Sequence, residues 1–236
     1  MNIRNLLVPL ACLVFFTDIQ TKTVKTSVII PCYYKHTQYL YSLLKLYEQQ
    51  TSLADEVVIS ISEIHKVDPA FLLALQEGPW LFPVKIFTSE QVQQAGTNKN
   101  ICCNHATGDI FIIQDADDIP HPQRVEIIKY FFENYEVDHI MHRYFWLDYP
   151  KDVDFVLQKN FASIPVSWAQ NYPCCDINYT NGEIALTKEV FNKIQWTAWS
   201  VGEDVIFNRE VYVQFKHCLL IDIPLLSYNF FLSSHF

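Results

Sequence analysis

Short, β-branched segments that alternate with helical segments constrain the fold of this chain more than any other feature of its sequence. Three of these segments have the composition of strands buried inside a sheet: Ser27–Pro31, Glu56–Ile61 and Val84–Phe87. The stretches between them, Gln38–Gln50 and Pro69–Gln76, repeat apolar side chains at helical spacing. Because strands that alternate with helices are joined by right-handed crossovers, we expect an α/β fold with a mostly parallel sheet. In such a fold, ligands bind at the edge of the sheet where the strands end.

The composition indicates a substantial core and argues against nucleic acid as a partner. Half of the 236 residues are hydrophobic and only 5 are glycine, which excludes a disordered or low-complexity chain. Lys and Arg total 17 against 26 for Asp and Glu, and the resulting net charge of -9 repels a phosphate backbone over most of the surface. A small anionic ligand remains compatible with this charge if a metal ion or a few local cations neutralise it.

The first 23 residues are set apart from the rest of the chain. Arg4 precedes an apolar run, Leu6–Phe16, whose length suits the core of a signal peptide better than a membrane span of about 20 residues. Two interpretations remain open: a targeting segment or short anchor, and an extra apolar helix that packs on the domain. We therefore expect an N-terminal segment with a linker over residues 1–23 and one domain over residues 24–236. Any membrane contact is expected through this segment alone, and the location of the protein stays open among cytoplasm, membrane and export.

Three carboxylates follow the predicted strand Asp109–Gln114. Asp115 and Asp117 project to the same face of an extended chain, so both can reach one hard divalent cation. Without a cation, the mutual repulsion of these carboxylates is costly. The alternative is structural, with Asp118 capping a helix that begins near Pro122. One carboxylate satisfies that role, so three at the end of a buried strand favour metal binding.

A second acidic motif, Gly202-Glu203-Asp204, stands directly before a segment whose apolar residues have helical spacing. Acidic side chains at the start of a helix are stabilised by its free N–H groups and its dipole. Capping alone therefore explains this motif when it is considered by itself.

The order of several motifs resembles that of the family 2 glycosyltransferases, which have the GT-A fold. The motifs occur in family order over residues 25–215, as Ser27–Tyr33, Ala95–Asn100, Ala106–Asp118, His121–Arg124, Asn181–Ile194 and Gly202–Asn208. The resemblance implies a single GT-A-like, Rossmann-like domain in which helices flank a mostly parallel central sheet. It also implies transfer of a sugar from a nucleoside-diphosphate donor, which we expect to be a UDP-sugar, to a hydroxyl group of an acceptor such as a glycan.

The same resemblance assigns the first acidic motif to metal and donor binding. Asp115-Ala116-Asp117 corresponds to the DxD motif, which holds Mn²⁺ or Mg²⁺ against the donor diphosphate. It implies Asp117 as the direct ligand, Asp118 as the alternative ligand, and Asp115 nearer the ribose or a metal-bound water. His235 stands near the C-terminus, where related enzymes supply a further ligand. The chemistry agrees, because a nucleoside diphosphate leaves readily only when a cation offsets its developing charge.

Other positions of the family pattern belong to the donor site. Pro31 and Tyr33, at the end of the first strand, are expected to bind the nucleotide-sugar, and Lys99 stands where an arginine is usual. Lys99 can pair with a phosphate or a carboxylate, or it can lie on a solvated helix face. The family's Asp-Asp-Gly-Ser turn, which reads the base, is absent here, so Ser62 or Glu63 is expected to accept the base N–H instead.

In the resembled family, the position of Glu203 and Asp204 supplies the general base that takes a proton from the acceptor hydroxyl. We expect Asp204 in that role and Glu203 as its substitute, with in-line attack and inversion at the anomeric carbon. Trp196 and Trp199 precede this motif. Their rings are expected either to stack on an acceptor sugar or to pack in the core.

Two other interpretations use the same residues. A catalytically inactive descendant would bind a sugar nucleotide or a glycan without turnover, and the altered base-reading turn favours it. Residues Ile112–Ile119 also approximate the DxDx(T/V) pattern of haloacid-dehalogenase phosphatases, in which Asp115 would be the nucleophile. In that family the motif follows the first strand of the core, whereas here it follows about the fourth predicted strand.

Overall fold

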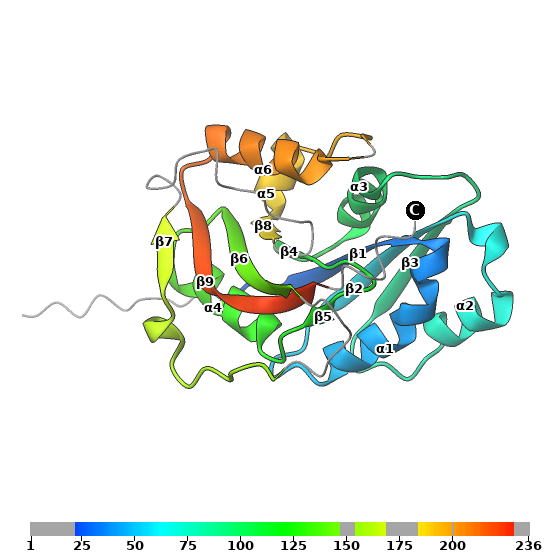
Figure 1. The fold of residues 1–236 in the computed structure, drawn as a ribbon, viewed down its shortest axis with the longest axis horizontal. Coiled ribbons are helices and arrows are strands. Elements are labelled where there is room, and N and C mark those ends of the chain that lie inside the picture. The colour runs from blue at the N-terminus through cyan, green and yellow to red at the C-terminus, as the bar shows by residue number, and fades with distance from the viewer. Residues whose placement is uncertain (1–21, 147–153, 169–183, 200, 229–236) are drawn as a thin grey trace, which may run out of the picture.

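The computed structural model describes residues 22–146, 154–168, 184–199 and 201–228, which form an α/β domain (Figure 1). The first half of this domain alternates strands with helices, as predicted: β1 (Thr26–Tyr33), α1 (Thr37–Glu48), β2 (Glu56–Ser62), α2 (Pro69–Gln76), β3 (Val84–Ser89), α3 (Ala95–His105) and β4 (Ile110–Ile113). The second half is less regular: β5 (Ile119–Pro120), α4 (Arg124–Asn134), β6 (His139–Trp146), β7 (Val166–Trp168), β8 (Ile184–Thr187), α5 (Lys188–Lys193), α6 (Glu203–Gln214) and β9 (Cys218–Tyr228). Of the expected N-terminal segment, residues 1–21 lie outside the described ranges.

The described strands form one sheet in the order β3-β2-β1-β4-β8-β6-β9-β5, and β7 pairs with β9. β1 runs parallel to β2 and to β4, and β2 runs parallel to β3. β8 then joins antiparallel between β4 and β6, so the second half of the sheet is mixed. The predicted α/β class is confirmed, and the carboxyl ends of the neighbouring strands β1 and β4 meet at one edge of the sheet.

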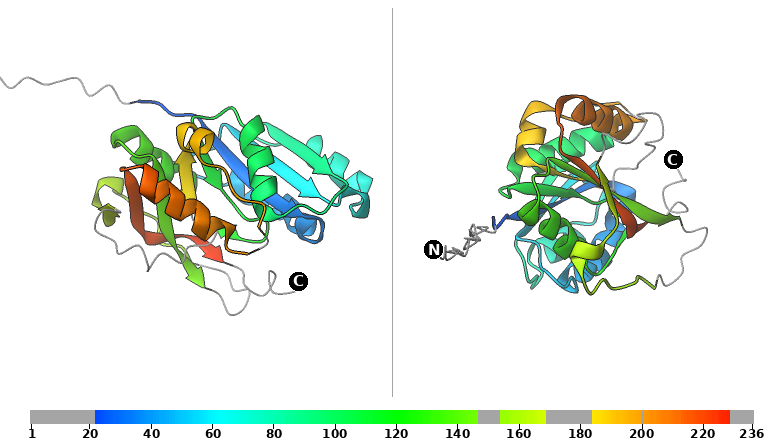
Figure 2. Two further views of the ribbon diagram at one scale, coloured as in Figure 1. Left: turned by 90° about the horizontal axis from the view of Figure 1, so that it is seen from above. Right: turned by 90° about the vertical axis from the view of Figure 1, so that its left-hand side faces the viewer.

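Two apolar cores lie on opposite faces of this sheet, one under α1, α2 and α4 and the other under α3, α5 and α6 (Figure 2). Within β1, Val28 and Ile30 belong to the first core and Ile29 to the second. Successive side chains of a strand point to opposite faces, so a strand covered on both faces needs an unbroken apolar run. Burial of each of these side chains contributes about 1.5–3 kcal/mol before entropy is counted.

The first residue of α4 tests whether Asp118 caps a helix, an alternative that the sequence left open. α4 begins at Arg124 with Gln123 in the capping position, so the interpretation of Asp118 as a helix cap is wrong. Asp118 instead precedes the short strand β5, which pairs with β9. At α6, the cap is Gly202 in the left-handed conformation (φ 79°), and Glu203 and Asp204 lie in the first turn, as predicted. None of the helices in the described ranges is both long and apolar enough to cross a membrane.

Candidate functional site

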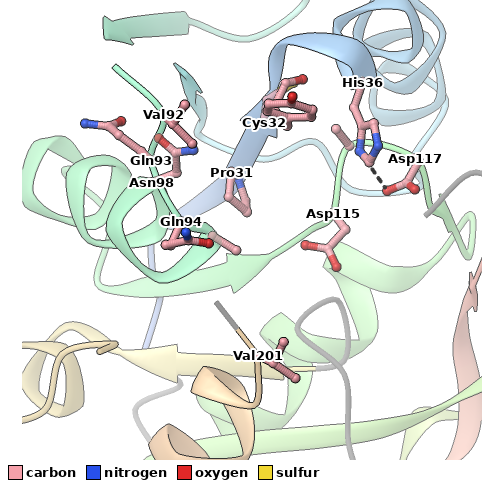
Figure 3. Close-up of a pocket in the computed structure, with 13 residues that line it drawn as sticks. Pro31, Cys32, His36, Val92, Gln93, Gln94, Asn98, Asp115, Asp117 and Val201 are labelled. Atoms are coloured by element: carbon pink, nitrogen blue, oxygen red, sulfur yellow. Dashed lines mark hydrogen bonds and ion pairs between the residues drawn. The ribbon is translucent and has the colours of Figure 1, made fainter. Parts of the chain in front are cut away.

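A cavity of about 590 Å³ opens at the carboxyl ends of β1 and β4 (Figure 3). Its walls come from five parts of the chain: the end of β1, the turn after it, the segment that leads into α3 with the first turn of that helix, the acidic turn after β4, and Val201 just before α6. The lining residues are Pro31, Cys32, Tyr33, His36, Val92, Gln93, Gln94, Ala95, Asn98, Asp115, Ala116, Asp117 and Val201. The position agrees with the expected ligand site of a parallel sheet, and it includes Pro31, Tyr33, Asp115 and Asp117 from the predicted set.

The acidic turn is held from behind by a buried polar network. The side-chain amide of Gln114 donates hydrogen bonds to the backbone oxygens of Asp115, at 2.8 Å, and Asp118, at 3.1 Å. Its Oε1 accepts hydrogen bonds from the Tyr47 hydroxyl, at 2.9 Å, and from the guanidinium of Arg124, at 2.8 Å. Since Gln114, Tyr47 and Arg124 are fully buried, the network fixes the turn that carries the carboxylates.

Asp117 is the carboxylate best suited to receive a cation. Its Oδ1 lies 3.7 Å from Nδ1 of His36, and its Oδ2 is buried without a hydrogen-bond partner. Burial raises the pKa of Asp117, and the nearby His36 opposes that rise. Asp118 is also buried but is not among the residues that line the cavity, so the structure gives no support to it as the alternative ligand.

The two acidic motifs influence each other electrostatically, although they are far apart in the sequence. Burial raises the pKa of Asp115 to about 7. The positive charge of Lys99 opposes this rise, while the charges of Asp117, Asp204 and Glu203 add to it. Val201, just before the motif at the start of α6, lines the cavity, whereas Glu203 and Asp204 are not among its lining residues.

Lys99 and Glu203 form a buried ion pair that joins α3 to α6. The Lys99 side chain is fully buried, and its Nζ lies 3.2 Å from Oε1 of Glu203. The same ammonium lies 5.5 Å from the centre of the Trp196 ring, within the range of a cation–π contact. Of the two expected roles of Lys99, the solvated helix face is therefore wrong, and pairing with a carboxylate is observed.

Further contacts hold α3 against the segment that leads into α6. The side chain of Asn100 donates to the backbone oxygen of Trp196, at 2.8 Å, and accepts from its backbone N–H, at 3.0 Å. At Gly96, an added Cβ would lie 2.3 Å from the backbone oxygen of Thr197, so only glycine fits this approach. These contacts hold Trp196 and Thr197, in the segment that leads into α6, against α3.

Asp204 is the more accessible carboxylate of its motif. Glu203 is buried and paired with Lys99, whereas Asp204 is half-buried. Burial raises the pKa of Asp204, and Lys99 opposes that rise. A raised pKa makes this carboxylate a stronger base than an exposed one when it is ionised.

Several predicted binding residues are placed elsewhere. The ring of Trp196 is only 3% exposed and stacks on Phe207 at 3.9 Å between ring centres, so Trp196 belongs to the core and the prediction that it stacks on an acceptor is wrong. Trp199 is 62% exposed and keeps that prediction open. His235 lies outside the described residues.

The turn expected to read the base is occupied by internal contacts. Glu63 has a left-handed backbone (φ 57°), and its carboxylate pairs with Lys66 and accepts a hydrogen bond from Tyr33. Ser62 is fully buried, and neither residue lines the cavity. The structure therefore gives no support to the expectation that Ser62 or Glu63 accepts the base N–H.

Sequence reasoning missed His36, whose imidazole lies beside the Asp117 carboxylate at the cavity wall. It also missed the Gln114 clamp, the buried hydrogen bonds by which Gln114 and Arg124 hold the acidic turn. His36 lies three residues beyond the end of β1, so its position at the ligand edge of the sheet was a usable signal. The clamp had no comparable signal, because it depends on contacts among α1, α4 and β4 that only the folded chain reveals.

The donor set fits a cation that is bound jointly by protein and ligand. Within the described residues, no group of three or more His, Cys, Asp or Glu side chains is arranged to hold a metal ion. Asp117 nevertheless offers a buried carboxylate oxygen without a partner, at the wall of a cavity. Mg²⁺ and similar ions are commonly held by one or two carboxylates together with substrate phosphates and water, so Asp117 and Asp115 suffice as protein ligands.

Comparison with known proteins gives a family match and several structural matches. The model of the family described as "Glycosyl transferase family 2" matches residues 27–172. No curated protein sequence matches the chain.

Three solved structures illustrate the structural similarity. S. aureus TarS in complex with UDP has a TM-score of 0.68 and 17% identity over 86% of this chain and 60% of that one. The mannosyltransferase PcManGT from Pyrobaculum calidifontis, in complex with GDP-Man and Mn²⁺, has a TM-score of 0.61 and 16% identity over 88% and 57% of the two chains. Glucosyl-3-phosphoglycerate synthase from Mycobacterium tuberculosis, with Mn²⁺, UDP and glucosyl-3-phosphoglycerate, has a TM-score of 0.60 and 14% identity over 87% and 72%. At these identities the matches show a shared GT-A fold, and the chain spans 60% of the length of the TarS structure.

Proposed function

Because this chain belongs to glycosyl transferase family 2, we propose that it transfers a sugar from a nucleoside-diphosphate donor to a hydroxyl group of an acceptor, with inversion at the anomeric carbon. The observation that carries the proposal is the proximity of the two acidic motifs: the first lines the cavity, and the second follows Val201, which lies at the cavity wall. Asp115 and Asp117 line that cavity, and the charges of Glu203 and Asp204 act on Asp115. Neither helix capping nor fold stability requires this arrangement, because burying like charges side by side is unfavourable.

The donor diphosphate is proposed to bind beside the DxD turn with Mn²⁺ or Mg²⁺. When bound, the cation offsets the negative charge that develops on the departing nucleoside diphosphate. Asp117 would hold it directly, through the oxygen that has no hydrogen-bond partner, and Asp115 would hold it or one of its waters. The Gln114 clamp keeps both carboxylates aimed at the cavity.

The nucleoside is proposed to bind toward Pro31, Tyr33 and the segment before α3. A UDP-sugar is the proposed donor, since TarS and glucosyl-3-phosphoglycerate synthase are both solved with UDP. With Glu63 held by Lys66, polar groups of the cavity wall must contact the base. The amide oxygen of Gln93 is available for this purpose, because it is buried at that wall without a hydrogen-bond partner.

Asp204 is the proposed general base. The pairing of Glu203 with Lys99 compensates the Glu203 charge and fixes its position, which leaves Asp204 as the carboxylate that can accept a proton from the acceptor hydroxyl. Attack from the side of α6, opposite the departing diphosphate, inverts the anomeric carbon. Trp199, which is exposed just before α6, is the proposed platform for an acceptor sugar.

The test is a thermal-shift panel of UDP-, GDP- and CMP-sugars with and without Mn²⁺, followed by release of nucleoside diphosphate in the presence of glycan acceptors. A donor that binds only the folded protein stabilises it by about 2.7 kcal/mol at one hundred times its Kd. We expect a Mn²⁺-dependent shift with UDP-sugars that Asp117→Asn abolishes. Asp204→Asn should keep the shift and lose transfer. The control Glu189→Gln removes an exposed carboxylate of an ion pair with Lys193 and should change neither result.

Each outcome bears on a separate part of the proposal. Donor binding that survives both a chelator and Asp117→Asn would contradict the cation assignment. Full transfer by Asp204→Asn would contradict the base assignment. Tight donor binding by the unmodified protein without transfer to any acceptor would identify the inactive descendant, and release of inorganic phosphate would favour the phosphatase.

A further inference from the structure

His36 lies beside the DxD turn, at the wall of the cavity. It ends the 3-10 turn Tyr34–His36 that follows β1, and its side chain lines the same cavity as Asp117 (Figure 3). The turn is fixed by a hydrogen bond of 2.7 Å from the Thr37 hydroxyl to the backbone oxygen of Tyr34. The imidazole packs edge-on against the rings of Tyr33 and Tyr39, at 6.3 and 6.2 Å between ring centres. The ring is therefore held in place rather than free to turn into solvent.

The spacing between His36 and Asp117 is close to that of two adjacent ligands of one cation. Nδ1 of His36 lies 3.7 Å from Oδ1 of Asp117, which is too long for a good hydrogen bond between these atoms. Two adjacent ligand atoms that each bind one octahedral ion at about 2.1 Å lie about 3.0 Å apart, so a shift of less than about 1 Å brings both atoms onto one ion. The other oxygen of the same carboxylate, Oδ2, is buried without a hydrogen-bond partner. The carboxylate is itself 93% buried, since its side chain is 7% exposed.

We propose that Nδ1 of His36 is a ligand of the divalent cation that Asp117 binds, with diphosphate oxygens and water at the remaining positions. This inference rests on the proposed function, because it concerns the cation of the donor complex. Imidazole binds Mn²⁺ better than it binds Mg²⁺, whose preferred ligands are oxygens. The presence of His36 therefore makes the site selective for Mn²⁺ over Mg²⁺.

The competing explanation is a simple ion pair between His36 and Asp117, in which the incoming cation displaces His36 from the carboxylate. The two explanations predict opposite effects of removing the imidazole. If His36 is a ligand, its removal weakens Mn²⁺ binding. If His36 only competes with the cation for Asp117, its removal leaves Mn²⁺ binding unchanged or strengthens it.

The experiment measures Mn²⁺ binding to the full chain by electron paramagnetic resonance, with UDP present and no acceptor. We expect His36→Gln to weaken Mn²⁺ binding at least about tenfold, with a smaller loss for Mg²⁺ measured by competition. The electron spin echo of bound Mn²⁺ should show coupling to a ¹⁴N nucleus, which His36→Gln abolishes. His36→Asp puts a carboxylate in place of the imidazole and should recover binding, with the preference shifted toward Mg²⁺.

Two control variants separate His36 from other histidines. His65→Gln removes an exposed imidazole that pairs with Glu90 and should leave the ¹⁴N coupling intact. His217→Gln removes an imidazole that lies 3.4 Å from the Asp138 carboxylate, and it should also leave the coupling intact. Coupling that persists in His36→Gln, or Mn²⁺ affinity equal to that of the unmodified protein, would overturn the assignment of His36. In that case the proposed function stands if Asp117→Asn abolishes Mn²⁺ binding, and both fail if the unmodified protein binds no Mn²⁺ with UDP.

Discussion

Replacement of Lys99 by methionine is the sharpest test of how α3 positions the second acidic motif. In the folded protein its ammonium lies 3.2 Å from the Glu203 carboxylate, and the two side chains are 0% and 7% exposed. Lys99→Met removes the cation that compensates this buried carboxylate, and such a loss costs about 3–5 kcal/mol. At roughly 2–4 °C per kcal/mol for a domain of this size, the melting temperature should fall by roughly 6–20 °C.

The double variant Lys99→Met with Glu203→Met is the matched control. It replaces the pair by apolar side chains of similar length, a change that is often neutral or stabilising, so most of the lost stability should return. The assay is calorimetric or chemical unfolding of the metal-free protein, single and double variants side by side. A single variant within about 2 °C of the unmodified protein, or a double variant as unstable as the single one, would refute the buried ion pair as the link between α3 and α6.

Three further predictions concern the same edge of the sheet. Gly96→Ala would normally stabilise a helix, but here the added methyl group would lie 2.3 Å from the backbone oxygen of Thr197. The free energy of unfolding should therefore fall by about 1–3 kcal/mol. A gain in stability would contradict the close approach of α3 to Thr197. Burial raises the pKa of Asp115 from 3.8 to about 7. Between pH 3.8 and about 7, the folded state therefore binds more protons than the unfolded state, so the stability of the metal-free protein should fall as the pH rises through this range. Asp115→Asn should flatten this slope in denaturant unfolding at several pH values, and an unchanged slope would locate the titration elsewhere. Gln114→Leu removes the side-chain hydrogen bonds to the DxD turn. It should lower the free energy of unfolding by about 1–3 kcal/mol and weaken the Mn²⁺-dependent binding of UDP in calorimetric titration. Unaltered UDP binding would show that the turn does not need these hydrogen bonds.

The local sequence was enough to predict the parallel part of the sheet. β1 carries Val28, Ile29 and Ile30 in succession, and such a run suits only a strand covered on both faces. α2 begins and ends at Pro69 and Gln76, as predicted, because Asp68 caps it and proline fits its first turn. These signals act within a few residues, so they can be seen without the fold.

Most of the errors at the site involve contacts between distant segments, and the exception is the local pair of Glu63 with Lys66. Trp196 and Lys99 are close to the predicted motifs, but α3, α5 and α6 enclose both of them, and no local pattern reports that enclosure. Glu63 was expected to read the base from its place after β2, yet its carboxylate is held by Lys66 one turn later. His36 was missed because its relation to Asp117 depends on the pairing of β1 with β4.

The most direct measurement is anomalous diffraction at the manganese edge from crystals of this protein grown with Mn²⁺ and UDP. We expect one manganese peak at about 2.1–2.3 Å from a carboxylate oxygen of Asp117, with the diphosphate of UDP bound to the same ion. A nucleotide bound in the cavity with no manganese beside Asp117, or manganese bound away from the ends of β1 and β4, would contradict this expectation.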